Sequence, residues 1–303
     1  MRIATAIVAF EPVTMLARPD QVQAVQELLG AEVEVLEATV DDLWARDTLP
    51  NFVVRTLEDG IAELAAGRVR FNGWGDKQIH EGDADLAATV AELLDIELID
   101  SGIVGEGGGL EVDGAGTVLA AESSWVNDNR NPGLTRDEIE AELLALLGGE
   151  RVVWVDGLAG EDITDGHIDT LARFADEQTI VVDRPASDEP GDPWTEVAAR
   201  THEQIRAART ADGDPYEVIE VVQPATPRGS GDSFLATYMN YYVCNGAVIA
   251  PEFGDADADA SAREVLEGLF PDREIVQIDI DAIAAGGGGI HCATMQQPAI
   301  EAG

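Results

Sequence analysis

The 303-residue chain carries a cysteine directly after its most glycine-rich stretch. Four consecutive glycines, Gly286–Gly289, are followed by Ile290, His291 and Cys292. Glycines allow a close approach of the backbone and positive φ angles. The chain has one other cysteine, Cys244, so a disulfide framework explains neither residue. Cys292 is therefore a candidate nucleophile, and the alternative is a small buried hydrophobic residue that follows a loop.

Three further loop-like segments, at 41–47, 106–117 and 162–169, contain the residue types that catalysis uses. In the last of them His167 and Asp169 are separated by one residue, which would put both side chains on one face of an extended backbone. The candidates from these segments are Trp44, Asp47, Glu106, His167 and Asp169.

Two carboxylates, a histidine and a cysteine in one cleft would supply a cation clamp, a proton shuttle and a nucleophile. A thiolate requires a lowered cysteine pKa, whereas neighbouring carboxylates raise that pKa. The set is therefore consistent only with a substrate that brings positive charge. A planar guanidinium keeps its charge and pairs with carboxylates through bidentate hydrogen bonds. These residue types favour a guanidine substrate over a peptide or an ester.

Structural interpretations compete with this hypothesis. The pair Asp165-Gly166 is typical of an ordinary turn, and His167 would then be a strand residue with satisfied hydrogen bonds. Together with Asp162, Asp165 and Asp169, His167 could instead bind a metal ion. Trp44 suits a hydrophobic core, and Glu106 could cap backbone amides in its glycine loop. Cys244 lies in an apolar run, where we expect it to be buried and unreactive.

The chain is strongly acidic, with 59 acidic residues against 18 basic ones and a formal net charge of −41. Lys77 is the single lysine, and the other bases are arginines. This balance favours a protein of a highly saline cytosol, where charge repulsion is screened within ~3 Å; the alternative is an acidic protein of ordinary salt. Such a surface repels nucleic acids and anionic lipids and attracts a small cationic substrate.

No apolar run approaches the ~20 residues of a membrane span, and the mean hydropathy is −0.04. The residues 3–10 are expected to form a first strand rather than a signal peptide, because no small-residue cleavage site follows. We therefore expect a cytoplasmic protein without a membrane or nucleic-acid partner. The sequence leaves open whether it forms a homo-oligomer.

Amphipathic patterns predict five helices, at 20–29, 83–94, 135–147, 194–208 and 259–269. In the third, Thr135 and Glu138 form a capping box, and the apolar stripe consists of Ile139, Leu143, Leu144 and Leu147. Apolar β-rich runs predict strands at 33–36, 52–55, 96–99, 118–121, 152–155, 179–182, 217–222, 238–243, 247–250 and 274–278.

Helix starts recur about every 50 to 65 residues, close to one fifth of the chain length. Each unit contains strands, one helix and a further strand. This period favours a radial repeat over one doubly wound sheet, and no Gly-rich loop of the Rossmann type follows the first strand. We expect the residues 1–303 to form one domain.

The segments together resemble the agmatine deiminase family of the guanidine-modifying (pentein) superfamily, from about Phe10 to Pro298. The motifs that carry the resemblance are residues 44–47 (WARD), 71–75 (FNGWG), 106–108 (EGG), 113–117 (DGAGT), 129–132 (NRNP), 165–169 (DGHID), 238–241 (YMNY), 245–246 (NG), 270–271 (FP) and 290–298 (IHCATMQQP). Each motif alone is weak, but their order and spacing are specific.

The resemblance implies an α/β propeller with fivefold pseudosymmetry, built from strand-strand-helix-strand units. It implies hydrolysis of agmatine to N-carbamoylputrescine and ammonia through a covalent thiouronium on Cys292, without a metal or organic cofactor. His167 would be the general acid and base, and Asp47 and Asp169 would hold the guanidinium. Trp44 and Glu106 fall in motifs near the site, which makes them candidate substrate-binding residues.

Some positions depart from the family pattern. Leu49 stands where the family pattern usually has glycine. Gly109 and Gly288 each stand where it usually has a polar residue. None of these is a candidate chemical residue, but they bear on what holds the far end of the substrate. Deimination of another guanidine or of peptidyl-arginine is therefore an alternative. Amidino transfer and non-catalytic guanidine binding are alternatives of another class.

Overall fold

The computed structural model describes residues 1–57, 62–187 and 190–300. Its strands are β1 (Val13–Ala17), β2 (Val33–Glu37), β3 (Asn51–Thr56), β4 (Ala62–Arg70), β5 (Glu97–Val104), β6 (Leu110–Val112), β7 (Thr117–Ala121), β8 (Arg151–Val155), β9 (Ala172–Phe174), β10 (Thr179–Arg184), β11 (Glu217–Val222), β12 (Tyr242–Cys244), β13 (Ala247–Glu252) and β14 (Glu274–Asp279). Its α-helices are α1 (Arg2–Ile7), α2 (Val22–Leu29), α3 (Ala45–Thr48), α4 (Gly73–Asp76), α5 (Leu86–Leu94), α6 (Glu122–Trp125), α7 (Arg136–Leu147), α8 (Pro193–Ala207), α9 (Ala256–Leu269) and α10 (Asp281–Ala284). Short 3₁₀ helices are η1 (Asp83–Asp85), η2 (Gly107–Gly109) and η3 (Ile168–Thr170).

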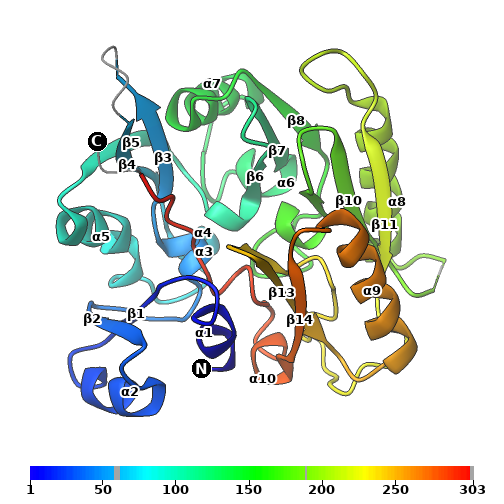
Figure 1. Ribbon diagram of the computed structural model, residues 1–303. Helices are drawn as coiled ribbons and strands as arrows, with labels where there is room; N and C mark the ends of the chain where they lie inside the picture. Colours follow the sequence, from blue (N-terminus) through cyan, green and yellow to red (C-terminus); the bar gives the residue numbers. More distant parts are fainter. Residues whose placement is uncertain (58–61, 188–189, 301–303) are drawn as a thin grey trace.

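One unit of chain repeats through this mixed α/β structure. In each three-stranded sheet the first two strands pair antiparallel, and the last strand pairs parallel to the middle one after a helical crossover. These sheets are β3-β4-β5, β6-β7-β8, β9-β10-β11 and β12-β13-β14, and the two-stranded sheet β1-β2 is parallel around α2. The sheets surround a centre that contains α3 and α4, with the longer helices outside (Figure 1).

All five helices that the sequence predicts are present, with boundaries shifted by a few residues. They correspond to α2, η1 with α5, α7, α8 and α9. At α7 the capping box is confirmed, because Thr135 accepts from the Glu138 backbone N–H while the Glu138 carboxylate accepts from the Thr135 backbone N–H. The buried face of α7 is Ile139, Leu143 and Leu146, and Leu144 and Leu147 are half-buried.

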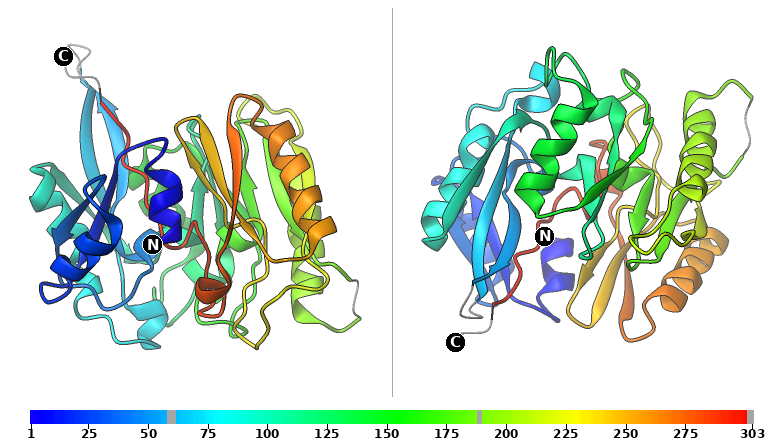
Figure 2. Two further views of the ribbon diagram at one scale, coloured as in Figure 1. Left: turned by 60° about the horizontal axis from the view of Figure 1, so that its bottom comes forward. Right: turned by 90° about the horizontal axis from the view of Figure 1, so that it is seen from above.

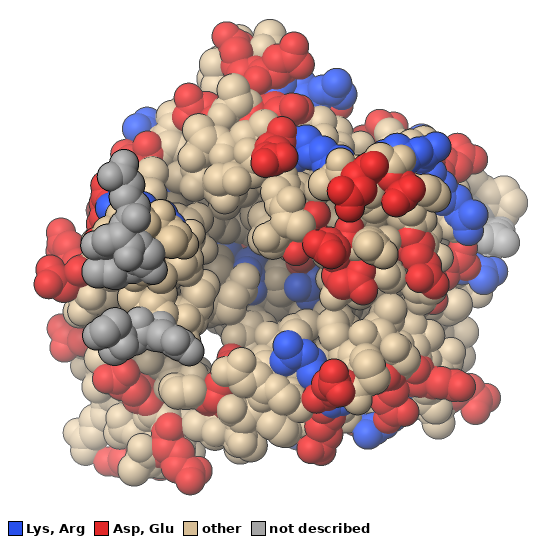
Figure 3. Space-filling view, turned by 45° about the horizontal axis from the view of Figure 1, so that its top comes forward, with Lys and Arg blue, Asp and Glu red and all other residues tan. Residues whose placement is uncertain are grey.

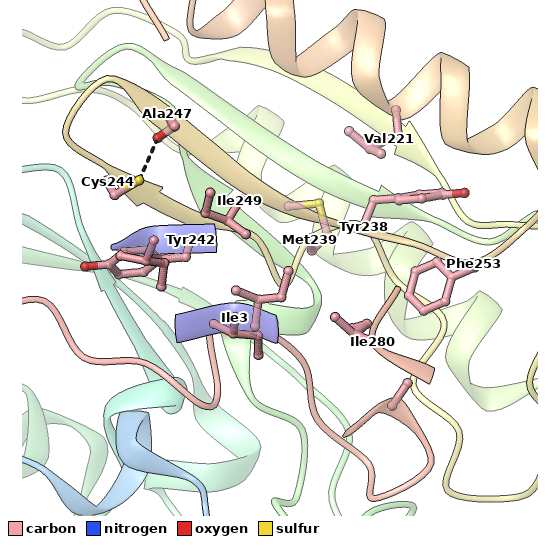
Figure 4. Close-up of a cluster of buried hydrophobic side chains, with 14 of the residues drawn as sticks. Ile3, Val221, Tyr238, Met239, Tyr242, Cys244, Ala247, Ile249, Phe253 and Ile280 are labelled. Carbon is pink, nitrogen blue, oxygen red and sulfur yellow. Dashed lines mark hydrogen bonds between the residues drawn. The ribbon is translucent and has the colours of Figure 1, made fainter. Parts of the chain in front are cut away.

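The predicted strand at 3–10 is wrong, because Arg2–Ile7 form helix α1. Helical spacing places Ile3 and Ile7 on one face, where they join a buried cluster with residues of β12 and β13. Figure 4 shows Ile3 beside Ile280 and Tyr242 in this cluster. Burial of the aliphatic side chains therefore outweighs the modest strand preference of isoleucine.

The predicted strand at 238–243 is only partly correct. β12 begins at Tyr242, and the residues 238–241 form an irregular segment with buried side chains. Four strands were not predicted from the sequence, namely β1, β4, β6 and β9. β6 and β9 have three residues each, too few for a recognisable alternation.

The last segment of the chain crosses the centre of the molecule. After α10 it passes α3 and continues toward β3, as Figures 1 and 2 show in red. The Arg46 backbone N–H donates to the Cys292 carbonyl (3.0 Å), and the Arg46 guanidinium donates to Gln296 Oε1 (2.7 Å). These hydrogen bonds fix the chain at Cys292 beside helix α3.

On the face that Figure 3 shows, acidic side chains are spread widely and are not gathered in one patch. The same view shows a hollow in the middle of this face, with basic side chains visible at its floor. In the described part of the chain, no helix has the length and apolar character that crossing a bilayer requires.

Candidate active site

The Cys292 thiol lies at the centre of a buried polar cluster. Cys292 is 8% exposed, and its Sγ lies 3.6 Å from Asp169 Oδ2. The side-chain amide of Asn240 donates to the same sulfur at 3.1 Å. Asn240 Oδ1 accepts from the Cys292 backbone N–H at 3.1 Å. The nucleophile candidate is thus held at both its backbone and its sulfur.

Asp169 has one oxygen bound by the protein and one that is not. Oδ2 accepts from His291 Nδ1 (2.8 Å) and from Asn240 Nδ2 (3.3 Å). Oδ1 is buried and has no hydrogen-bond partner among the described residues, although Asp169 is 0% exposed. A buried carboxylate oxygen without a donor costs free energy. This oxygen is therefore available for a donor that a ligand brings.

His167 connects two acids. Its Nε2 lies 3.2 Å from Glu106 Oε2, and its Nδ1 lies 3.8 Å from Asp47 Oδ1. Glu106 is fixed by Arg130, whose Nε lies 2.8 Å and 3.0 Å from the two carboxylate oxygens. Arg130 in turn contacts Asp165 Oδ2 at 2.8 Å. The imidazole therefore lies at one end of a buried chain of alternating charges.

Asp47 is held by one donor from the next unit and one from its own. Gly108 N–H donates to its Oδ1 (3.0 Å), and Trp74 Nε1–H donates to its Oδ2 (2.9 Å). A Cβ on Gly108 would lie 2.6 Å from His167 Nδ1 and 2.8 Å from Asp47 Oδ1, so only glycine permits this approach. The glycines after Glu106 thus bring the backbone against both chemical side chains.

The Trp74 donor comes from a left-handed turn, α4. Trp74 and Asp76 have φ angles of 57° and 59°, which cost about 1–2 kcal/mol each for residues other than glycine. Lys77 follows the turn, and its Nζ donates to Asp165 Oδ2 (2.7 Å). The turn is therefore bound to Asp47 through Trp74 and to Asp165 through Lys77. Strained backbone of this kind is often found near functional sites.

Trp44 lies against the glycine loop that precedes Cys292. A Cβ on Gly288 would lie 2.2 Å from the Trp44 ring, so the absence of a side chain there makes room for the indole. Trp44 is half-buried. The ring therefore forms a wall beside the cysteine loop. This position is consistent with a core residue and with a substrate-binding residue.

Burial and mutual repulsion raise the pKa values of the carboxylates that face the cysteine. Burial raises the pKa of Asp47, partly opposed by the charge of His167 and the bond from Trp74. Burial likewise raises the pKa of Asp169 to about 6, with the charge of His167 opposing and that of Asp47 adding. Because these two carboxylates are removed from water, their ionised forms cost free energy unless a cation lies beside them.

The histidine and its glutamate partner form a matched ion pair. Burial would lower the pKa of His167, but the charges of Asp47 and Glu106 outweigh it and raise this pKa to about 9. Burial would raise the pKa of Glu106, but the bond to His167 and the charge of Arg130 lower it. At neutral pH His167 is therefore an imidazolium that can donate a proton.

The thiol itself is held in its neutral form. Burial, followed by the charges of Asp169 and Asp47, raises the pKa of Cys292 well above its ordinary value. A guanidinium placed against both carboxylates would cancel their repulsion and stabilise a thiolate. This arrangement therefore favours a cationic substrate, whose charge would promote ionisation of the Cys292 thiol.

The structure brings together the residues that the sequence analysis selected, namely Asp47, Glu106, His167, Asp169 and Cys292. The extended backbone expected at His167 and Asp169 is wrong, because Ile168–Thr170 form η3. Both side chains nevertheless face the site.

The alternative metal cluster around His167 is not assembled. Asp162 caps its own turn through Thr164 and Gly166, and Asp165 is bound to Lys77 and Arg130. Asp165 and Gly166 have positive φ, so the predicted turn is confirmed. Cys244 is buried, and its thiol donates to the Ala247 carbonyl at 3.4 Å, as Figure 4 shows.

Four residues of the cluster were not assigned a role from the sequence, namely Trp74, Arg130, Asn240 and His291. All of them fall inside the motifs of the resemblance, which is the one signal that pointed to them. His291 also contacts Glu111 (3.5 Å), and burial together with the charges of Arg173 and Arg46 lowers its pKa. A neutral His291 therefore donates from Nδ1 to Asp169.

Comparisons with known proteins agree with this geometry. The sequence matches the family described as Porphyromonas-type peptidyl-arginine deiminase over residues 1–298. It is 41% identical to a putative agmatine deiminase of Streptomyces coelicolor, over 98% of this chain and 87% of that protein. It is 36% identical to an agmatine deiminase of Medicago truncatula, over 99% of this chain and 87% of that protein. The solved agmatine deiminase of Enterococcus faecalis superposes with a TM-score of 0.88 at 28% identity, over 98% and 86% of the two chains.

The protonation states predict an unusual pH dependence for guanidine hydrolysis. If Cys292 is the nucleophile and His167 the acid, attack requires a thiolate with a protonated His167, one proton fewer than the free site holds at neutral pH. We expect log(kcat/KM) to rise by about one per pH unit through the neutral range and to level off as pH passes the His167 pKa of about 9. Below the Asp169 pKa of about 6 the fall should steepen, because the clamp becomes protonated.

The profile is measured by initial rates across the pH range, with circular dichroism at each pH to show that the fold is intact. A flat profile from below neutrality to the alkaline limb would mean that the free thiol is already ionised, contrary to this assignment.

Proposed function

The chain belongs to the Porphyromonas-type peptidyl-arginine deiminase family, and from this premise we propose that it hydrolyses agmatine to N-carbamoylputrescine and ammonia. The protein is then a hydrolase that acts on the C–N bonds of linear amidines. The observation that carries the proposal is a buried thiol whose ionisation is opposed by two buried carboxylates. Only a cationic substrate makes such a site reactive.

The unpartnered oxygen of Asp169 supports a guanidinium in particular. A guanidinium presents several N–H donors in a plane, and a carboxylate accepts two of them side by side. Asp169 Oδ1 has no donor among the described residues. Each oxygen of Asp47 accepts one hydrogen bond from the protein and has the capacity for a second. We propose that Asp47 and Asp169 hold the guanidinium nitrogens from two sides, with its carbon beside Cys292.

The first half of the reaction forms the covalent intermediate. The arriving cation lets the thiol release its proton, and the sulfur lone pair forms an S–C bond to the guanidinium carbon. The neutral tetrahedral adduct then loses one nitrogen, which leaves as ammonia after it takes the proton of His167. A thiouronium cation remains on Cys292. Glu106 and Asp47 keep His167 protonated until this step.

The second half releases the product. His167, now neutral, removes a proton from a water molecule, and the oxygen attacks the thiouronium carbon. As the C=O bond forms, the S–C bond breaks and its electron pair returns to sulfur. The remaining hydroxyl proton of the adduct re-protonates Cys292, and the ureido product leaves. Trp44 would border the substrate beside Gly288. No step in this sequence calls on a metal ion or an organic cofactor.

The substrate alternatives concern what lies beyond the guanidine. Another small guanidine or peptidyl-arginine would react at the same four residues, and an amine that replaced water in the second half would give amidino transfer. A non-catalytic guanidine-binding protein would keep the clamp without turnover. A panel of agmatine, arginine and a blocked arginine peptide, assayed for ureido product, separates these possibilities.

We further propose that the five sheets close into a fivefold pseudosymmetric propeller and that residues 1–303 act as one catalytic domain. The shared topology of the four three-stranded sheets supports the repeat. Putrescine biosynthesis is the pathway that an agmatine deiminase would serve. A cytoplasmic location, and the absence of nucleic-acid partners, stay predictions from the sequence.

The thiouronium intermediate can be trapped. We expect acid quenching during turnover with agmatine to add the mass of agmatine less ammonia to the intact protein, and peptide mapping to place it on Cys292. Cys292→Ser should show neither the adduct nor turnover, because the weaker nucleophile is not activated by the clamp. Cys244→Ser is the matched control and should retain both. An adduct on Cys244, or turnover by Cys292→Ser, contradicts the proposal.

The charge of −41 also leads us to propose that the protein is adapted to high salt. Screening of repulsion requires a Debye length near ~3 Å, which corresponds to about 1 M salt. We expect circular dichroism and activity to fall together as KCl is removed. A sucrose series of equal water activity is the control, since sucrose lowers water activity and is excluded from the protein surface without screening charge. Full structure and activity in dilute buffer would contradict this proposal.

A further inference from the structure

Asn240 contacts the reactive sulfur, and the mechanism proposed above gives its side chain no role. It comes from the irregular segment before β12, while Cys292 follows α10. Its Nδ2 donates to Cys292 Sγ at 3.1 Å and to Asp169 Oδ2 at 3.3 Å. Its Oδ1 accepts from the Cys292 backbone N–H at 3.1 Å. One amide therefore bridges the nucleophile and one arm of the clamp.

The orientation of this amide is determined by its surroundings. The Cys292 backbone N–H can only donate, so the group facing it must be the oxygen of Asn240. The NH₂ group then faces the sulfur. Asn240 is 0% exposed, and a Cβ on Gly289 would lie 2.5 Å from its Oδ1. The glycine loop therefore packs tightly against the amide and leaves it no room to turn.

The sulfur has few other sources of stabilisation. Within residues 1–57, 62–187 and 190–300, Asn240 supplies the one side-chain donor within hydrogen-bonding distance of Cys292 Sγ, and the Gly289 backbone also acts to lower the pKa of this thiol. The neighbouring carboxylates, Asp169 and Asp47, oppose negative charge on it. Hydrogen bonds to a charged group are about twice as strong as neutral ones. The Asn240 contact therefore gains strength only when the thiol becomes a thiolate.

We propose that Asn240 is a further catalytic residue of the deimination: its amide N–H stabilises the Cys292 thiolate before attack and again when sulfur leaves. This inference rests on the proposed function. Asn240 transfers no proton. The thiol proton is released as the cation binds, sulfur donates the electron pair of the S–C bond, and the pair returns to sulfur when that bond breaks. The amide donates to sulfur in both thiolate states.

A purely structural role is the rival explanation, because Asn240 also holds the backbone of the cysteine loop. The two explanations differ in the chemistry of the thiol. A residue that only holds the loop changes stability and substrate binding, whereas a thiolate donor changes the pH at which the thiol ionises. Alkylation by a neutral reagent reports that ionisation without any substrate.

The experiment compares wild type, Asn240→Ala and Asn240→Asp. Iodoacetamide alkylation of the Cys292 peptide is followed by mass spectrometry as a function of pH. We expect the profile of Asn240→Ala to move to higher pH, with the rate at a fixed mildly alkaline pH reduced about tenfold or more. With agmatine, kcat should fall about 100-fold or more while KM changes far less, as for loss of one donor to a developing charge.

Asn240→Asp keeps an oxygen for the Cys292 backbone N–H but replaces the donor. We expect it to be as slow as Asn240→Ala at alkaline pH and to recover partly, relative to wild type, as pH falls, since a protonated carboxyl can donate to sulfur. This variant also carries the test if Asn240→Ala does not fold. Ile139→Ala, a buried truncation in α7 remote from the cysteine, is the control for lost stability alone.

An alkylation profile like that of wild type in the folded Asn240 variants would overturn the proposal, whatever happens to turnover. A shifted profile in the Asn240 variants but not in Ile139→Ala supports it. The outcome is separable from the proposed function, because absence of guanidine hydrolysis by wild type leaves the alkylation result readable.

Discussion

The structure depends on one electrostatic constraint: two carboxylates and a thiol are buried together, so that ionisation of the carboxylates disfavours ionisation of the thiol. Asp169 and Asp47 each have a raised pKa because they are withdrawn from water, and both raise the pKa of Cys292. The neighbouring His167 pairs with Glu106 and keeps its own positive charge. Because the charge of His167 only partly offsets the burial of these acids, a guanidinium would add the counter-charge that favours the thiolate.

The repeating topology explains how distant residues reach this cluster. In each three-stranded sheet, a cluster residue lies a few positions before the first strand: Asp47 before β3, Glu106 before β6, Asp169 before β9 and Asn240 before β12. Equivalent positions of equivalent units meet at one end of the sheets around the centre. The glycines after Glu106 and before Cys292 then permit contacts that a Cβ would block.

Local signals could be predicted from the sequence, and long-range contacts could not. The capping box of α7 was predictable because Thr135 and Glu138 are three residues apart. The chemical residue types and the glycine loops were also visible. The hydrogen bond from Asn240 to Cys292 spans 52 positions and that from His291 to Asp169 spans 122, so neither leaves a local pattern. Helix α1 was missed because burial of Ile3 and Ile7 outweighs their local preference.

The central claim is that the substrate's own cation ionises Cys292, and proton release tests it most directly. Wild-type protein in excess is mixed with agmatine in a weakly buffered indicator solution and followed by stopped flow. The account predicts release of about one proton per agmatine bound before ammonia appears, since the cation lowers the thiol pKa, and no such release from Cys292→Ser. Absence of this burst in wild type, or an equal burst from Cys292→Ser, would contradict it.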